Sequence, residues 1–514
     1  MEMEAQAYNP ILPSWEYIPD VEPHIFDGKL FLFGSHDRFN GTQFCMNDYV
    51  CWWAETDDLT TWHFEGVIYR IMQDPDAKPG MILQAPDVVH GIDGRYYLYY
   101  VLGVVPFMSV AVSDKPEGPY EYYGKVTYAD GTPVGTMPHD VFQFDPGVLV
   151  DDDGRVYLYT GFAPDSTGEF AAACQKYQME GAYVMEIAPD MRTVRAAPKL
   201  LIPKEEYAEG TDFHRHGFYE ASSIRKALNR YYFIYSSSQQ HELCYAVSDA
   251  PDRGFSFGGT LISNGDIGYQ GNVTPKNYTG NNHGSIICAK GQWYVFYHRH
   301  TNRHQYSRQA CAEKLELLEN GRFAQAEMTS CGLNEAALRG KGCYSASIVC
   351  NLFAKNGAMC YGVSDTPEAM EHPYLTQSGT DRENNPEQYI ANMRDGASAV
   401  FKYFDVHSIS GLGLLLGGTG TGYFEVRVAE QMIYVPVEKE AGSVHKWFYP
   451  GKLALRINDS RCALRFTYHG SGMIDFHAFY MEVNDVPKSP TKEQHIQPEF
   501  ISLISTPESF KKPP

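Results

Sequence analysis

A tight turn followed by an aromatic-rich run of strand-forming residues recurs five times between residues 26 and 297 of this chain. Two apolar runs on either side of a dipeptide such as Asp-Gly are a strong signal for a β-hairpin. A second strand signal with a Pro- or Gly-rich turn follows most copies, and this half of the sequence lacks long helical periodicity. The copies are FDGKLFLFG (26–34), IDGRYYLYY (92–100), DDGRVYLYT (152–160), ALNRYYFIY (227–235) and AKGQWYVFY (289–297).

The spacing of these copies constrains the fold class. They recur at intervals of 60 to 75 residues, and each interval reads as one all-β unit. Five similar units predict a five-bladed β-propeller in which some blades are longer than usual, because repeated sheets pack around a common axis. A plain β-sandwich would not explain five copies of one hairpin.

One ionisable residue opens the strand before each turn, seven to nine positions ahead of the turn residue. The first strand of each propeller blade lines the axis, so we expect these five side chains to meet at one mouth of the channel. They are Asp20, Asp87, Asp145, Glu220 and His283.

A structural role competes with this interpretation. An Asp before a strand is most often a turn or cap residue, and Asp87 and Asp145 each adjoin a proline. The recurrence in all five units, and the position of Glu220 in the apolar stretch FYEASS, favour a site. Neighbouring carboxylates raise one another's pKa values and so suit acid and base roles. Glycoside hydrolysis needs two such groups, which predicts a carbohydrate-active propeller.

The chain of 514 residues is too long for one ordinary core, so we expect more than one domain. The hairpin repeat stops near residue 328, and short alternating strands such as GYFEVRVAE and CALRFTYHG follow. We therefore predict a propeller over 1–327 and a β-sandwich over 328–485. The Pro- and Lys-rich end, 486–514, is expected to be an extended tail.

Composition excludes several classes of partner. The formal net charge of −21 argues against nucleic acid and anionic membranes, and no apolar run approaches the roughly 18 residues of a membrane helix. Eleven cysteines without a CxxC pair suit a reducing compartment, and the acidic N-terminus lacks the plan of a signal peptide. We expect a cytoplasmic protein whose partner is a small oligosaccharide; its oligomeric state stays open.

Five motifs, taken in order, resemble glycoside hydrolase family 43: IPDVEPHIF, QAPDVVHGIDGRYYLYY, FDPGVLVDDDGRVYLY, YEASSIRKALNRYYFIYSS and NNHGSIICAKGQWYVFYHRH. The resemblance implies a five-bladed propeller that cleaves with inversion. It implies Asp20 as the general base, Glu220 as the general acid, and Asp145 as the residue that orients the acid and adjusts its pKa.

The same resemblance implies further roles. It implies that His283 lies at the axis near a bound calcium ion, and that an Arg after the last inner strand contacts the substrate. Arg299 and Arg308 are the candidates, of which we favour Arg308, and we expect Asp87 to line the substrate pocket. The histidines of HRHTNRH (298–304) alternate on a strand without a Cys or carboxylate to complete a zinc site. The pieces DGASAVFKYFD and TGYFEVRV of the second unit resemble family 6 carbohydrate-binding modules.

These observations predict an inverting exo-glycosidase of pentose-containing oligosaccharides, a β-xylosidase or α-L-arabinofuranosidase. A cytoplasmic location would favour short imported substrates and therefore action at chain ends. Two alternatives remain, an endo-arabinanase with a cleft open at both ends and a sugar-binding propeller without catalysis. The sequence leaves the preferred sugar and the linkage open.

Overall fold

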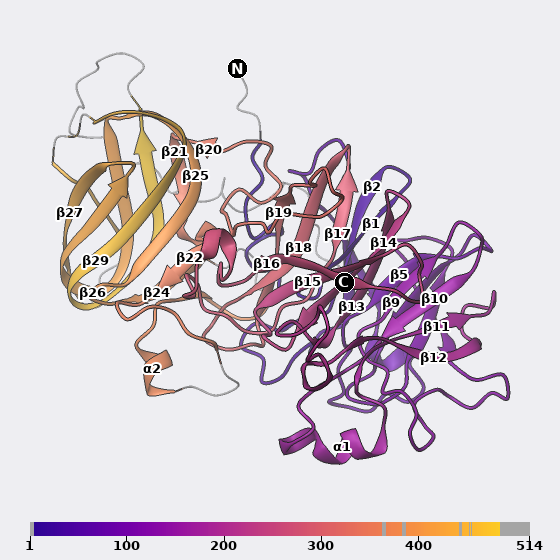
Figure 1. Cartoon of the computed structure of the whole chain (residues 1–514). Coiled ribbons are helices and arrows are strands. Elements are labelled where there is room, and N and C mark those ends of the chain that lie inside the picture. Colours follow the sequence, from indigo (N-terminus) through magenta and orange to yellow (C-terminus); the bar gives the residue numbers. More distant parts are fainter. Residues whose placement is uncertain are drawn as a thin grey trace.

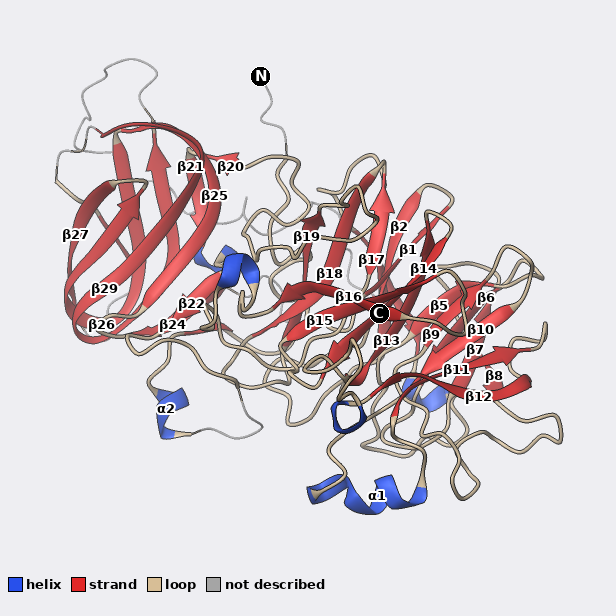
Figure 2. Cartoon of the chain, viewed as in Figure 1, coloured by secondary structure: helices blue, strands red, loops and turns tan. Residues whose placement is uncertain are grey.

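The computed structural model describes residues 5–361, 366–382, 387–440, 445–451, 453 and 455–483. Nearly all regular structure in these residues is β, as Figure 2 shows, and the α-helices among them are the short segments α1 (Ala171–Lys176) and α2 (Pro367–Met370). Among the described residues, no helix has the length and apolar character needed to cross a bilayer. The predicted tail, 486–514, lies outside the described residues. Single 3-10 turns lie at Ile71–Gln73, Gly168–Phe170, Glu205–Tyr207, Tyr269–Gly271 and Ala346–Ile348.

The first part of the chain is a five-bladed β-propeller, as predicted (Figure 1). Each blade is an antiparallel sheet in which strands pair in chain order, and the fifth has three strands instead of four. The blades are β1 (Glu22–Phe26), β2 (Lys29–Phe33), β3 (Tyr49–Glu55) and β4 (His63–Tyr69); β5 (Asp87–His90), β6 (Tyr96–Tyr100), β7 (Ser109–Ser113) and β8 (Glu121–Lys125); β9 (Gly147–Val150), β10 (Val156–Thr160), β11 (Gly181–Ile187) and β12 (Val194–Pro203); β13 (Phe218–Ala227), β14 (Arg230–Ser237), β15 (Glu242–Ser248) and β16 (Ser256–Ser263); and β17 (Ile286–Ala289), β18 (Gln292–His300) and β19 (Arg308–Leu315).

The recurring turn of the sequence joins the first two strands of each blade. In the first blade Phe26 pairs with Lys29, so Asp27 and Gly28 form a two-residue loop with φ of 49° and 80°. Positive φ at both loop positions is the geometry that matches the twist of a hairpin, which explains the Asp-Gly signal. The fourth and fifth blades use the same loop geometry at 228–229 and 290–291.

Hydrophobic side chains fill the space between neighbouring blades. Each of five buried clusters combines residues from two adjacent sheets, including the pair formed by the first and fifth blades. The aromatic strand residues supply much of this core, and Tyr100, Tyr159 and Tyr235 are fully buried. The N-terminal segment completes the ring, because Ile11 N donates to Ala310 O of β19 and Ala312 N donates to Asn9 Oδ1.

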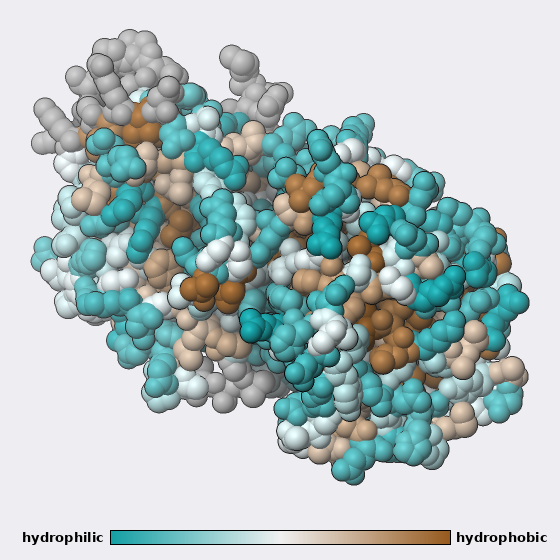
Figure 3. Space-filling model, in the orientation of Figure 1, coloured by the Kyte–Doolittle hydropathy of each residue, from teal (hydrophilic) through white to brown (hydrophobic). Residues whose placement is uncertain are grey.

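Ten strands form a second all-β unit around a core of its own, in orange and yellow in Figure 1. Four phenylalanines in tilted or edge-to-face contact, at positions 401, 466, 476 and 479, belong to that core. Its strands are β20 (Leu338–Arg339), β21 (Gly342–Ser345), β22 (Asn351–Phe353), β23 (Tyr374–Gln377), β24 (Gln388–Met393), β25 (Ser398–Ile409), β26 (Gly411–Val428), β27 (Gln431–Lys439), β28 (Lys446–Phe448) and β29 (Leu455–Glu482). The face of the molecule in Figure 3 is mostly hydrophilic, in line with the strongly acidic composition.

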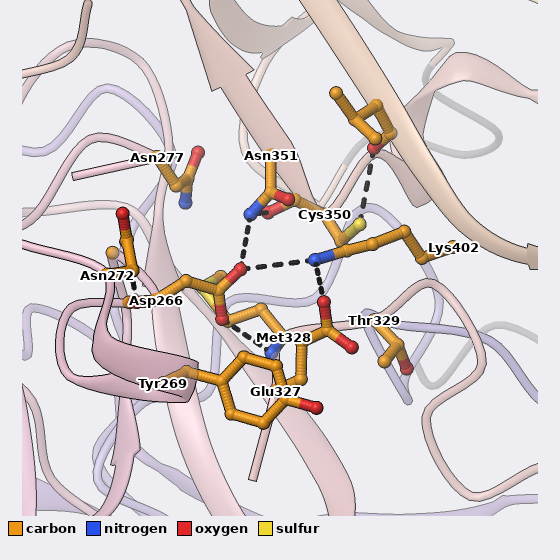
Figure 4. A network of polar contacts seen from close by, with 12 residues as sticks. Asp266, Tyr269, Asn272, Asn277, Glu327, Met328, Thr329, Cys350, Asn351 and Lys402 are labelled. Carbon is orange, nitrogen blue, oxygen red and sulfur yellow. Dashed lines mark hydrogen bonds and ion pairs between the residues drawn. The ribbon is translucent and has the colours of Figure 1, made fainter. Parts of the chain in front are cut away.

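A buried ion-pair network joins the two units (Figure 4). Lys402 Nζ of β25 lies 3.2 Å from Asp266 Oδ2 of the propeller and 2.8 Å from Glu327 Oε1 of the connecting segment. Asn351 Nδ2 donates to the same Asp266 oxygen at 2.8 Å. Breaking a buried pair by removing one partner typically costs about 3–5 kcal/mol, so this network fixes how the units pack.

Candidate active site

The topology of the blades brings several loops to one mouth of the central channel. Adjacent strands run in opposite directions, so each inner strand starts at the same end as the loop between the second and third strands of its blade. We call this end the acidic mouth, because Asp20, Asp145, Glu220 and His283 lie at or just before the starts of inner strands. The loops 34–48, 161–180 and 301–307 flank the same mouth.

The backbone bends at each of the three acids. Asp20 and Asp145 have φ of 56° and 46°, and Ala221, directly after Glu220, has φ of 69°. The pairing of β13 with β14 shifts register on both sides of Glu220, which marks a bulge at that point. Left-handed backbone is strained for residues other than Gly, and such strain clusters at functional sites. The bends turn the three side chains toward one another.

Four of the five predicted residues converge at this mouth. His283 Nδ1 lies 3.8 Å from Asp20 Oδ1 and 3.6 Å from Asp145 Oδ2. Asp145 Oδ2 also accepts the backbone N–H of Ala221 at 2.9 Å, which ties the third blade to the residue after Glu220. Asp20, Asp145 and His283 are buried, and Glu220 is partly exposed, so Glu220 is the acid that opens toward solvent.

Arg308 connects Asp20 to a second carboxylate, Asp37. Its Nη1 donates to Asp20 Oδ1 at 2.9 Å, while Nε and Nη2 donate to the two oxygens of Asp37 at 2.9 and 3.1 Å. The guanidinium is only 2% exposed. Burial alone would lower the pKa of Arg308, but the charges of Asp20 and Asp37 outweigh it and raise the pKa. Asp20 is therefore ion-paired with a permanent cation.

Glu220 and Asp145 lie in a different electrostatic environment. Burial raises the pKa of Glu220 to about 7, helped by the charge of Asp20 and opposed by Arg308. Burial also raises the pKa of Asp145 well above its ordinary range, with further contributions from Glu220 and Asp20. Of Asp20, Asp145 and Glu220, only Asp20 has a hydrogen bond to the Arg308 guanidinium among the described contacts. The site therefore sets one carboxylate paired with a cation beside two carboxyls whose pKa values are raised.

Asp87 does not join this cluster. Its Oδ1 lies 2.7 Å from His24 Nε2 and accepts the N–H of Val88, and its Oδ2 accepts the N–H of Val148 at 2.8 Å. Its side chain is fully buried, so these contacts occupy both oxygens. We expected Asp87 to line the substrate pocket, but the structure sets it into the channel wall, where it links three neighbouring blades.

Two arginines and two missed residues complete the comparison with the sequence. Arg308 lies at the site, whereas Arg299 donates to Ser347 O and Val349 O of the second unit. Asp37 was not singled out from the sequence, although its position after the second strand of a blade places it in a loop at the acidic mouth. His298 was considered only for zinc; its Nδ1 accepts the N–H of Asp20 at 3.4 Å. Burial holds the pKa of His298 well below its ordinary value, so the ring is neutral.

A cluster of half-buried aromatic rings flanks Asp145 and Glu220. Phe162, on the loop that leads to α1, has its ring centroid 5.2 Å from that of Phe144 and 5.6 Å from that of Tyr219. Phe144 and Tyr219 directly precede Asp145 and Glu220. Phe142, Phe170 and Tyr177 extend the cluster. Such rings are suited to stack on the faces of sugars.

Oxygen-rich groups lie deeper in the channel. Glu22 Oε1 is buried without a hydrogen-bond partner among the described residues, while its Oε2 accepts from Arg225 Nη2 at 2.7 Å and Ser223 Oγ at 3.1 Å. Ser223 in turn lies 2.7 Å from Ser285 Oγ, two positions after His283. A hard cation such as calcium prefers oxygen ligands, so the unpartnered carboxylate oxygen fits that chemistry. The histidines at 298, 300 and 304 form no metal-binding group among the described residues.

Comparison with known proteins gives consistent matches. A family model described as "Glycosyl hydrolases family 43" matches residues 41–323, which include Asp145, Glu220 and Arg308 but begin after Asp20 and Asp37. The chain is similar to a "Xylosidase/arabinosidase" of Thermoclostridium stercorarium, with 47% identity over 484 residues, 93% of this chain and 99% of the relative. This match extends through the second unit. A "Xylosidase/arabinosidase" of Bacteroides ovatus is 30% identical over 314 residues, 55% of this chain and 86% of the relative.

A solved structure agrees with the propeller. It is a family 43 β-xylosidase/α-arabinofuranosidase from a compost microbial metagenome, in complex with xylotriose and in a calcium-free form. It matches with a TM-score of 0.50 and 25% identity over 63% of this chain and 98% of that chain.

Proposed function

The chain belongs to glycosyl hydrolase family 43, and from this premise we propose that it releases single xylose or arabinose units from pentose-containing oligosaccharides. It would act as a β-xylosidase and α-L-arabinofuranosidase, with inversion at the anomeric carbon. The observation that carries this proposal is the division of charge at the acidic mouth: Arg308 is bonded to Asp20, while Glu220 has a pKa raised to about 7. The relative that covers nearly the whole chain carries the name xylosidase/arabinosidase.

The proposed reaction is a single displacement. Asp20, ionised beside Arg308, removes a proton from a water molecule as that water forms a bond to the anomeric carbon. Glu220 gives its proton to the glycosidic oxygen as the bond from that oxygen to the anomeric carbon breaks. The products are a pentose of inverted configuration and the shortened alcohol, and the two carboxyls regain their starting states by exchanging one proton with solvent. Inverting enzymes keep these groups about 6.5–9.5 Å apart to admit the water.

Asp145 and Arg308 have supporting roles in this proposal. Asp145 holds the backbone beside Glu220 through the N–H of Ala221, and the negative charge of Asp20 disfavours ionisation of the acid. Arg308 is assigned to positioning Asp20, because Nη1 donates to Asp20 while Nε and Nη2 donate to Asp37. A substrate contact of Arg308 would involve the edge of Nη1 beside Asp20.

We propose that Glu22 and the segment of His283 would hold calcium. The support is the unpartnered oxygen of Glu22 and its hydrogen-bond link through Ser223 and Ser285 to the segment of His283. Calcium would supply charge compensation and rigidity to the inner strands. The proton transfers are assigned to Asp20 and Glu220 alone.

The domain bounds and the location belong to the same proposal. We propose a β-sandwich similar to family 6 carbohydrate-binding modules over 328–485, after a catalytic propeller over 1–327. We also propose a cytoplasmic location, supported by eleven cysteines that are all free. Short oligosaccharides would then be the natural substrates.

Hydrolysis of nitrophenyl β-xyloside, nitrophenyl α-L-arabinofuranoside and xylotriose by the wild-type protein tests the activity. Proton NMR of the first product identifies the anomer, and the proposal requires inversion at the start of the reaction. Loss of a general acid or base typically lowers the rate by about 10²–10⁴-fold. The rate of xylotriose hydrolysis should therefore fall by such a factor in both Glu220→Gln and Asp20→Asn. Cleavage of internal bonds in arabinan with no release of single pentoses would instead favour an endo-arabinanase. Binding of xylotriose without turnover would favour a sugar-binding propeller without catalysis.

A further inference from the structure

A segment of the second unit forms part of the rim of the acidic mouth. Strand β23 and the residues up to 382 lie on two loops of the propeller, 34–48 of the first blade and 301–307 of the fifth. Asn302 N donates to Leu375 O at 2.7 Å, and the buried Tyr17 hydroxyl donates to Gln377 Oε1 at 2.7 Å. The second unit thus contacts the propeller at Tyr17 and Asn302 as well as through the Lys402 network.

Asp381 connects the two arms of the first-blade loop. Its Oδ1 accepts the N–H of Phe39 at 2.8 Å, and its Oδ2 accepts Asn47 Nδ2 at 3.2 Å. Asn47 Nδ2 also donates to the backbone carbonyl of Asp37 at 2.9 Å, and Cys45 N donates to Asp37 Oδ1 at 2.9 Å. One carboxylate of the second unit therefore contacts the loop at two points, Phe39 and Asn47, both of which follow Asp37 in the chain.

Arg382 reaches the base of the same loop. Its Nη1 donates to Glu16 Oε1 at 2.6 Å, and Glu16 is almost completely buried. His36 Nε2 lies 2.9 Å from the same oxygen, and Trp52 Nε1 donates to the other carboxylate oxygen at 2.9 Å. Burial alone would raise the pKa of Glu16, but the charges of His36 and Arg382 lower it to about 2. The cation from the second unit thus stabilises a buried carboxylate next to the loop.

These contacts lead directly to the proposed general base. His36 precedes Asp37 in the chain, Asp37 bonds twice to the Arg308 guanidinium, and Arg308 bonds to Asp20. We infer that Asp381 and Arg382 of the second unit are positioning residues for catalysis, which hold the loop of Asp37 so that Arg308 orients Asp20. This inference rests on the proposed role of Asp20 and assigns the second unit a part in the active site, beyond any binding of carbohydrate.

Two variants in the full-length protein, Asp381→Ala and Arg382→Ala, test the inference. A small misplacement of a catalytic group costs up to about 10²-fold, so we expect kcat to fall about 10- to 100-fold with a smaller change in KM. The base acts on water whatever the leaving group, so the loss should be equal for dinitrophenyl β-xyloside and for xylotriose. The kcat/KM profile against pH is measured beside kcat, and both should differ from the wild type in these two variants. Arg382→Lys should restore part of the activity.

Two controls separate positioning from folding. Asn351→Ala removes the contact between the units at Asp266, which shares no residue with the contacts of Asp381 and Arg382, and Arg394→Ala removes a surface ion pair with Glu371 within the second unit. Both should keep the wild-type kcat and pH profile, even where Asn351→Ala lowers Tm. If Asp381→Ala and Arg382→Ala lower Tm but keep kcat and the pH profile, the segment only joins the units and the inference is wrong. If Asp20→Asn itself keeps full activity, the assignment of the base is wrong instead.

Discussion

Arg308 Nη1 donates to Asp20 Oδ1 at 2.9 Å across a sequence separation of 288 residues, from the fifth blade to the first. This bond lies at the point where the last blade closes against the first, so closure of the ring assembles the ionised acid. Glu220 has no such cation among its described contacts and retains a pKa of about 7. Two carboxyl groups in one mouth are thereby prepared for opposite proton transfers.

Arg308→Lys should impair catalysis strongly. A lysine ammonium cannot reproduce the fork that spans Asp20 and Asp37, so both carboxylates lose aligned bonds. We expect kcat/KM on xylotriose to fall by about 10²–10³-fold, since truncating one partner of a buried charged pair costs about 2–5 kcal/mol. Steady-state kinetics measures this. Arg299→Lys is the matched control, because Arg299 is similarly buried but bonds to the second unit. Equal losses in both variants would contradict the role of Arg308.

The pH dependence of kcat/KM should reflect the ionisation of Glu220. The general acid must be protonated, and its pKa is raised from 4.5 to about 7, so kcat/KM should fall as pH rises through about 7. The limb should vanish in Glu220→Gln, measured on dinitrophenyl β-xyloside, which needs little acid assistance. A basic limb that persists unchanged in this variant would assign it to another group.

Ionisation of Glu220 should also lower the free energy of unfolding at high pH. A carboxyl whose pKa is raised on folding binds its proton more tightly in the folded state, so its contribution to the free energy of unfolding falls as pH rises from about 4.5 to about 7. Glu220→Gln removes this cost. At pH 8 the variant should be more stable than the wild type by up to about 3 kcal/mol, from about 1.4 kcal/mol per pKa unit.

Thermal unfolding at pH 8 and pH 4 measures the effect, and the difference should disappear at pH 4. Glu209→Gln, at an exposed glutamate, is the control and should leave Tm unchanged at both values. A Glu220→Gln variant that gains no stability at pH 8 would show that the folded protein does not bind the proton as described.

The aromatic cluster beside Glu220 should contact the leaving group. The acid protonates the leaving oxygen, so the departing sugar has to lie on the side of Phe162 and Tyr219. We expect Phe162→Ala to raise KM for xylotriose by about 10-fold, while the inhibition constant of free xylose, which fills only the pocket of the cleaved sugar, stays unchanged. Phe26→Ala, at the opposite mouth of the channel, is the control. A parallel rise in the inhibition constant of xylose would place Phe162 against the cleaved sugar instead.

The sequence predicted the propeller because its signal is local and repeated. A turn such as Asp27-Gly28 determines one hairpin without reference to the rest of the chain, and five copies determine the architecture. The same register predicted the convergence of Asp20, Asp145, Glu220 and His283, since inner strands start at one mouth. Asp87 follows the register but turns into the wall, because two backbone N–H groups and His24 take up its oxygens.

Contacts between distant segments escaped prediction for a physical reason. Asp37 matters because Arg308 lies 271 residues away in the chain and next to it in space. Asp381 and Arg382 belong to a segment of the second unit without any repeat or motif to mark it. Such residues have no local pattern, and only the packing of the units brings them to the site.

The leaving-group dependence of Asp20→Asn and Glu220→Gln, measured on aryl β-xylosides and xylotriose, tests the division of roles most directly. A general acid assists departure of the leaving group. Glu220→Gln should therefore lose little activity on dinitrophenyl β-xyloside, and its activity on xylotriose should fall about 10²–10⁴-fold. A base assists attack, so Asp20→Asn should lose a similarly large factor on both. The reverse pattern, or wild-type rates on xylotriose in either variant, would contradict the account.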